Sequence, residues 1–211
     1  MKAAEAYADL RRFGKPVLTS ADAAVRLRAS LSAASRILAG LAKAGLVLRL
    51  RRGTWSFDPR IDPLALPEYL TAPHPAYVSF QSALYLHGMI SQIPRVTYVA
   101  SLGRTRRVKT AIGTYSIHRL PPELFGGFTT VGTPPLHLAS PEKALVDLFY
   151  LGNVRSRLFA RLPELELPPE FRVREARRWI AAIPAPYKRT MVRKRLDEQL
   201  AARIESRSRR P

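Results

Sequence analysis

The side chains best spaced for chemistry lie on one face of a helix predicted over residues 31–44. Ser32, Arg36 and Lys43 follow at intervals of four and seven residues, so they share that face, and Ser35 flanks it. The opposite face is an apolar arc of Ala34, Ile37, Leu38, Leu41 and Ala44. A helix that enters the DNA major groove offers small polar side chains and an arginine to base edges and a lysine to phosphate. We therefore expect the two serines and Arg36 to contact bases and Lys43 to contact phosphate.

A short basic hairpin is predicted directly after this helix. Residues 46–51 alternate with period two, with leucines on one side and Val47 and arginines on the other, and the turn falls at Gly53. Four residues near the tip are expected to touch DNA as a wing does: Arg49, Arg51, Arg52 and Thr54. Trp55 could stack on a base, but we expect it to anchor the hairpin to the core. For this helix alone, an ordinary solvated surface helix would be the better interpretation, and the hairpin is what favours DNA binding.

A second basic run lies in the middle of the chain, on a loop predicted between two strands. It consists of Arg104, Arg106, Arg107 and Lys109. It could bind phosphate or an acidic protein face, or it could be a solvated edge that protects a sheet from pairing. The sequence leaves both interpretations open.

The overall charge points to a polyanionic partner. The 211 residues include 35 Lys and Arg against 16 Asp and Glu, a formal net charge of +19, with a 46% hydrophobic fraction that argues against disorder. The net charge, counted as Lys and Arg minus Asp and Glu, is +8 in residues 1–60, +2 in residues 61–150 and +9 in residues 151–211. Both ends could therefore face nucleic acid. An arginine-rich surface composition alone is the alternative.

Other kinds of chemistry are poorly represented. The chain has no cysteine, which excludes disulfides and thiolate metal sites, and its four histidines lack metal-ligand spacing. No phosphate-binding loop, dinucleotide fingerprint or serine nucleophile elbow is present. Glu142 and Asp147 are five positions apart on a predicted helix and so face different ways. We expect no catalytic residue, no metal and no cofactor, and a protein that is not an enzyme.

Nothing in the sequence suggests a membrane. No apolar run approaches the roughly 20 residues of a membrane span. The amphipathic start, MKAAEAYADLRRFG, carries two acidic residues and resembles neither a signal peptide nor a transit peptide. We expect a cytoplasmic protein with no membrane partner.

The elements that must position the basic side chains form an α+β chain. Residues 1–60 are predicted to hold helices over 2–13, from Thr19 with a capping box to Asp22, and over 31–44, and then the hairpin. That order is typical of a winged helix-turn-helix. Residues 61–76 are a proline-rich connector. Residues 77–211 are predicted to form a mixed α/β domain, with a strong helix start at residues 140–142 and a helical, basic C-terminus.

Two C-terminal segments carry a family resemblance. They are YVSFQSALYLHGMISQIPRVTYVAS (residues 77–101) and ASPEKALVDLFYL (residues 139–151), and both resemble the C-terminal domain of AbiEi-type antitoxins. Members of that family also place a winged helix-turn-helix first, often with a basic G-x-Y or G-x-W hairpin, similar to residues 52–55 here. The resemblance covers roughly residues 10–155, and the basic tail after it departs from the family pattern.

The resemblance implies the antitoxin of a type IV toxin–antitoxin, or abortive-infection, system. Such an antitoxin represses its own operon by binding inverted repeats in double-stranded DNA, and it counteracts a nucleotidyltransferase-like toxin without requiring a tight complex. Two alternatives stay open. One is a regulator whose C-terminal domain senses a ligand in an apolar pocket among Leu84, Val99, Ile117 and Leu148. The other is an inhibitor that binds the toxin protein directly.

Overall fold

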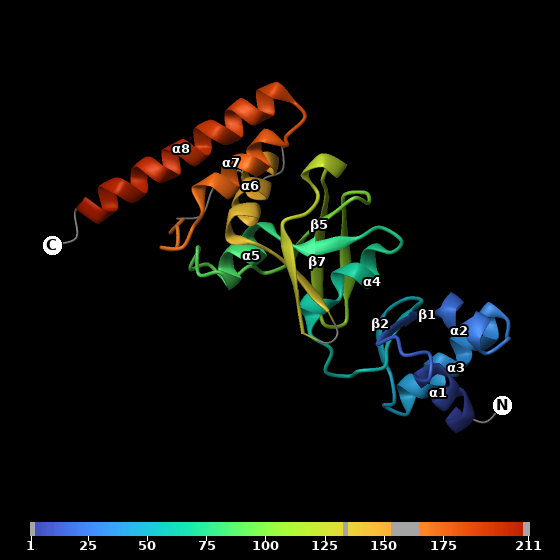
Figure 1. The fold of residues 1–211 in the computed structure, drawn as a ribbon. Helices are drawn as coiled ribbons and strands as arrows, with labels where there is room; N and C mark the ends of the chain where they lie inside the picture. Colours follow the sequence, from blue (N-terminus) through green and yellow to red (C-terminus); the bar gives the residue numbers. More distant parts are fainter. Residues whose placement is uncertain (1–2, 133–134, 153–164, 209–211) are drawn as a thin grey trace.

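The computed structural model describes residues 3–132, 135–152 and 165–208, which form a mixed α+β structure (Figure 1). Within the described residues no helix is both long and apolar enough to cross a membrane.

The N-terminal unit combines three helices with a small sheet. Its elements are α1 (Ala3–Arg11), β1 (Val17–Thr19), α2 (Ser20–Arg26), α3 (Leu31–Lys43), β2 (Leu48–Arg51) and β3 (Thr54–Ser56). The Thr19 and Asp22 side chains form the predicted capping box, and Ser30 caps α3 through the Ala33 N–H. The three strands pair antiparallel in the order β1-β3-β2. The three predicted helices are confirmed, whereas β1 is too short to show a period in the sequence.

The small sheet is apolar on both faces. Val47, Trp55 and Phe57 pack with the helices of the N-terminal unit. Leu48 and Leu50, on the other face, pack against residues of the second half of the chain. The alternation predicted for the hairpin therefore holds over residues 47–50, and the leucine side packs against the second half of the chain.

The proline-rich connector is a packed element. It contains a 3₁₀ turn (Pro63–Ala65) and α4 (Pro67–Thr71), and it buries Ile61, Leu66 and Leu70 in the same apolar cluster as Leu50. The Leu50 carbonyl of β2 also accepts a hydrogen bond of 2.7 Å from the Ala111 N–H, at the turn of a hairpin in the larger sheet. The N-terminal unit is thus joined to the rest by a shared core and by backbone.

The C-terminal unit is built on a six-stranded mixed sheet in the order β6-β7-β5-β4-β9-β8. The strands are β4 (Ala76–Val78), β5 (Thr97–Ser101), β6 (Arg106–Thr110), β7 (Gly113–Arg119), β8 (Phe128–Val131) and β9 (Leu136–Ala139). Pairs β4–β9 and β5–β7 are parallel, and the others are antiparallel. The prediction of a loop across residues 104–109 is wrong, because β6 occupies most of it as an edge strand.

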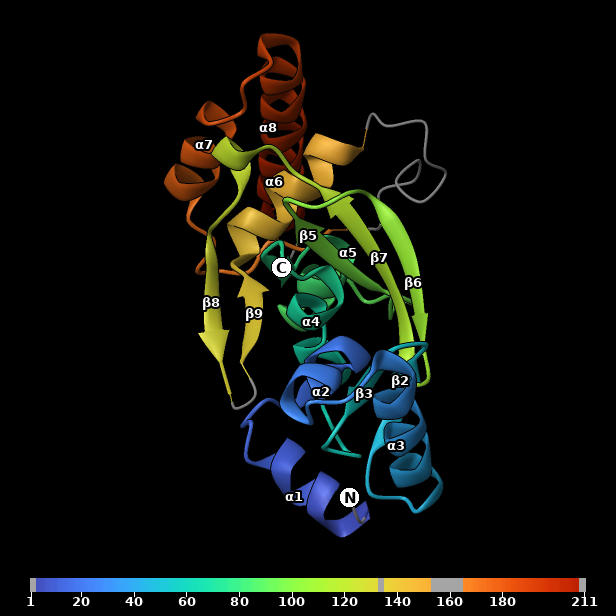
Figure 2. The same ribbon diagram turned by 90° about the vertical axis from the view of Figure 1, so that its right-hand side faces the viewer.

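Helices cover one face of this sheet. The helices α5 (Phe80–Leu86) and α6 (Pro141–Leu151) contact it, and α7 (Val173–Ala181) and α8 (Pro186–Ser208) pack against α6; a further 3₁₀ turn lies at Pro122–Leu124. Tyr98 and Ala100 of β5 point to the helices, whereas Val99 between them points to the connector side. Both views place α8 at the end of the molecule farthest from α3 (Figures 1 and 2).

Candidate nucleic-acid interface

The α3 helix divides into the two faces that the sequence predicts. Ala34, Leu38 and Leu41 are fully buried and Ile37 is half-buried, whereas Ala44, expected in the apolar arc, is exposed as the C-cap residue. The opposite face is solvent-exposed at Ser32, Arg36, Ala39 and Lys43, and Ser35 is half-buried beside it. The Ser32 hydroxyl lies 3.1 Å from the hydroxyl of the cap residue Ser30. The described residues supply no ion pair or hydrogen bond to the cationic groups of Arg36 and Lys43, so both are available to a partner.

A groove runs between α3 and the hairpin. It is a cavity of ≈ 510 Å³, and α3 lines it with Leu31, Ser35 and Ala39. The hairpin lines the other side with Arg49, Arg52, Gly53 and Trp55. The Arg49 guanidinium lies 5.4 Å from the centroid of the Trp55 ring, a cation–π distance that fixes the arginine at the groove. The exposed face of α3 and two hairpin arginines thus border one depression.

Two of the predicted hairpin contacts are corrected by the structure. Thr54 is only 3% exposed, and its hydroxyl accepts a hydrogen bond of 3.2 Å from Nε of Arg51, so it is not offered to a partner. Arg51 is half-buried rather than exposed, and burial together with the nearby Arg106 lowers its pKa. The cause is a register shift between Arg49 and Arg51, which places Arg51 near the C-terminal unit. Only Arg49 and Arg52 remain as hairpin cations that border the groove.

Trp55 anchors the hairpin, as expected. The ring is 3% exposed, and its indole N–H donates a hydrogen bond of 3.0 Å to the Ser20 hydroxyl at the start of α2. The Gly53 carbonyl accepts from the Ser20 N–H as well. The hairpin tip is therefore held against α2 and does not project freely.

The second basic run does not form one patch. Side chains alternate along β6, so Val108 is buried on the connector side and Arg106 donates to the Leu70 carbonyl at 2.7 Å. Arg107 and Lys109 are exposed on the opposite face, and Arg104 is exposed in the loop before the strand. Charged side chains spread along an edge strand in this way disfavour its pairing with a strand of another molecule.

Many C-terminal arginines are engaged in structural contacts. Arg189 donates to the Ile183 carbonyl at 2.8 Å, Arg195 to that of Phe149, and Arg203 to that of Pro168. Others pair with acids: Arg172 with Glu142, Arg177 with Asp197 and Arg178 with Glu175. Much of the local positive charge therefore stabilises helix ends and packing, in a region remote from α3 (Figure 2).

The most buried polar cluster joins β4 to α6. Lys143 and Asp147 form an ion pair with both side chains fully buried. Asp147 also accepts hydrogen bonds from the Tyr77 hydroxyl at 3.0 Å and the Ser79 hydroxyl at 2.7 Å. Burial raises the pKa of Asp147 and lowers that of Lys143, and their mutual attraction opposes both shifts. The groups satisfy one another, so this is a structural cluster.

The histidines are dispersed. Burial lowers the pKa of His118 to about 4, and its Nε2 lies 2.9 Å from the Ser116 hydroxyl. His87 donates to the Ala139 carbonyl from the C-terminus of α5, and His137 pairs with Glu68. Among the described residues no group of three or more acidic, histidine or cysteine side chains could hold a metal ion.

The apolar pocket considered for a ligand-sensing domain is not formed by the residues expected. Leu84 and Leu148 belong to the cluster under the helices, whereas Val99 and Ile117 belong to the cluster on the connector side. All four are at most 1% exposed, and the sheet separates the two pairs. These four residues therefore do not line one pocket.

The chain was compared with models of known protein families and with curated proteins, and it matches none of them.

Proposed function

We propose that the chain binds DNA through an N-terminal winged helix-turn-helix. The element order α1-β1-α2-α3-β2-β3 and the sheet order β1-β3-β2 support this assignment. In it, α3 is the recognition helix and the β2–β3 hairpin is a short wing. The observation that carries the proposal is the groove that Arg49 and Arg52 share with α3, beside the helix face that exposes Arg36 and Lys43.

The proposed division of labour follows from side-chain chemistry. Arg36, on the exposed face of α3, presents a planar fork that can pair with the O6 and N7 acceptors of a guanine. Ser32 and Ser35 are small enough to let the helix approach the base edges. Lys43 and Arg52 lie farther from that centre, and they contact phosphates, which supply affinity without sequence preference.

The finer proposal is an AbiEi-type antitoxin that represses its own operon at inverted repeats. Its functional partner is a nucleotidyltransferase-like toxin, which it counteracts without a stable complex. The resemblance of residues 77–101 and 139–151 suggests this function. Support comes from the meeting of both segments at one place, where Tyr77 and Ser79 from the first hydrogen-bond Asp147 from the second.

Binding of the full chain to the DNA upstream of its own gene tests the first proposal. Arg36→Ala is expected to weaken binding to a duplex of this upstream sequence by about 1–3 kcal/mol. It should change binding to a duplex of scrambled sequence far less. Arg174→Ala is the matched control, since it removes an exposed arginine from α7 at the far end of the molecule. Equal affinity of the unsubstituted chain for both duplexes, or equal losses in the two variants, would refute the proposal.

Co-expression with the product of the adjacent gene tests the antitoxin proposal. If that product arrests growth and the chain restores it, with no complex surviving size-exclusion chromatography, the proposal stands. A stable complex would instead favour direct inhibition of the toxin. Growth arrest that the chain does not relieve would exclude an antitoxin role and leave the DNA-binding proposal intact.

A further inference from the structure

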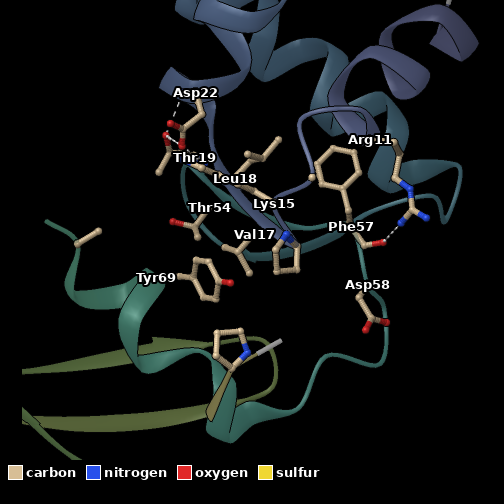
Figure 3. Close-up of a pocket in the computed structure, with 14 residues that line it drawn as sticks. Arg11, Lys15, Val17, Leu18, Thr19, Asp22, Thr54, Phe57, Asp58 and Tyr69 are labelled. Carbon is tan, nitrogen blue, oxygen red and sulfur yellow. Dashed lines mark hydrogen bonds between the residues drawn. The ribbon is translucent and has the colours of Figure 1, made fainter. Parts of the chain in front are cut away.

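A cavity of ≈ 900 Å³ lies where the N-terminal unit meets the C-terminal unit (Figure 3). The N-terminal unit lines it with Arg11 at the end of α1, with residues 14–19, and with further residues of α2, β3 and the segment that follows β3. The other side is formed by Tyr69 and Ala72 at α4 and by Pro135 before β9. This volume lies within the usual range for pockets that bind small molecules.

The cavity wall is largely apolar and contains several rings. Pro16, Val17, Leu18, Phe57 and Pro135 contribute to it. The Tyr69 side chain projects into the space between Val17 and the C-terminal unit (Figure 3). Burial raises the pKa of Tyr69, so its hydroxyl stays neutral and can donate or accept one hydrogen bond. Such a wall suits a flat apolar body.

The acidic side chains at the cavity already accept hydrogen bonds from nearby residues of the chain. Asp22 accepts hydrogen bonds from the Thr19 N–H at 2.8 Å and the Thr19 hydroxyl at 2.6 Å, as the capping box of α2. Burial raises the pKa of Asp22, but these hydrogen bonds and the positive charge of Lys15 outweigh it and the pKa is lowered, so the carboxylate stays ionised. Asp58 accepts from the Arg60 N–H at 2.9 Å. Neither acid requires a cation in the cavity.

The two cations at the cavity retain unused donors. Arg11 donates one N–H to the Phe57 carbonyl at 3.3 Å. A guanidinium carries five N–H donors in total. The Lys15 ammonium lies 4.9 Å from the centroid of the Phe13 ring, and within the described residues it has no carboxylate within ion-pair distance. The cavity therefore combines an apolar wall with two cationic side chains, of which Arg11 keeps unused donors and Lys15 is partly offset by Asp22.

We propose that this cavity binds a small aromatic anion. The anionic group lies toward Arg11 and Lys15, and the ring packs against Pro16, Phe57 and Pro135, within reach of the Tyr69 hydroxyl. Because the walls come from both units, the bound molecule contacts both. The proposal does not depend on DNA binding, and no residue that we place at the DNA interface is used.

The probe for the test is 8-anilinonaphthalene-1-sulfonate, a fluorescent aromatic anion. The full chain is expected to bind one molecule saturably with a rise in fluorescence. The variant Arg11→Gln/Lys15→Gln is expected to bind about tenfold more weakly, the loss of one charge-assisted hydrogen bond. Arg193→Gln/Lys194→Gln makes the same change in charge on exposed residues of α8 and should leave binding unchanged.

A second variant tests the volume rather than the charge. Ala72 is exposed and lines the cavity, so Ala72→Trp fills the space and is expected to abolish binding. Near-ultraviolet circular dichroism and thermal unfolding of each variant must match the unsubstituted chain, because this dye also binds partly folded states. No saturable binding below about 1 mM, or equal binding by the cavity variants and the α8 control, overturns the proposal.

Discussion

Replacing Lys143 with methionine is expected to destabilise the C-terminal unit by about 3–5 kcal/mol, the cost of leaving one member of a buried ion pair uncompensated. Methionine keeps most of the packing, because it is unbranched and of similar length and can contact the rings of Tyr77 and Trp179, whose centroids lie 5.5 Å and 5.1 Å from the Lys143 ammonium. The loss thus isolates the charge of Asp147, which keeps only its hydrogen bonds from Tyr77 and Ser79.

Two further measurements separate charge from packing. Lys143→Met/Asp147→Asn keeps an acceptor for the two hydroxyls but removes both charges, and it is expected to regain about 2 kcal/mol over the single variant. In Lys143→Met, burial raises the folded-state pKa of Asp147 above its unfolded value. The stability that such a carboxyl contributes is present below the unfolded pKa and is lost as the pH rises through the folded pKa. The loss in free energy of unfolding of Lys143→Met, relative to the unsubstituted chain, is therefore expected to become smaller as the pH is lowered.

Urea unfolding followed by tryptophan fluorescence measures both effects. The chain has two tryptophans, Trp55 in the N-terminal unit and Trp179 in α7, so a Trp55→Phe background reports the C-terminal unit alone. With a slope of about 2 kcal/mol per molar urea, the expected loss moves the midpoint by about 2 M. A loss below about 1 kcal/mol, or a deficit independent of pH, would show that the pair is not the desolvated, mutually compensated one described here.

Three other outcomes are expected. Trp55→Ala lowers the free energy of unfolding by about 3–5 kcal/mol in thermal or urea unfolding, because the ring is buried and hydrogen-bonded. Arg52→Ser weakens DNA binding several-fold with unchanged stability, whereas Arg51→Ser affects DNA binding less, and equal effects in duplex titrations would contradict the corrected position of Arg51. Burial keeps His118 neutral, so its stabilising contribution is present above pH 6.5 and is lost as the pH falls toward about 4. In His118→Gln, the free energy of unfolding is expected to fall by roughly 3 kcal/mol less between pH 6.5 and about 4 than in the unsubstituted chain.

The sequence predicted best those features that depend on neighbouring residues. Caps, glycine positions and apolar periods lie within one helix or turn, and they located α2, α3 and the start of α6. Trp55 was assigned correctly as an anchor. The Lys143–Asp147 pair has the i, i+4 spacing of helix neighbours, so the sequence carried a signal for it.

Features that depend on distant parts of the chain were not predictable from one sequence. The parallel pair β4–β9 rests on Val78 beside Leu138, 60 residues apart, and neither strand is long enough to show a period. The hairpin alternation did not reveal what Leu50 packs against, because its partners come from the connector and the larger sheet. The cavity at the junction draws on Arg11, Lys15 and Tyr69, and only folding brings them together.

The two edges of the larger sheet bear on the colloidal behaviour of the protein. The β6 edge carries Arg107 and Lys109, whereas β8 is uncharged, with exposed threonines and a Val131 that is 54% exposed. Among the described residues no strand covers the outer side of β8, so that side can template pairing with another chain. A net charge of +19 keeps like molecules apart at low ionic strength, but that repulsion reaches only about 8 Å at physiological salt. We therefore expect concentrated salt to weaken the repulsion between molecules and to favour association through the β8 edge.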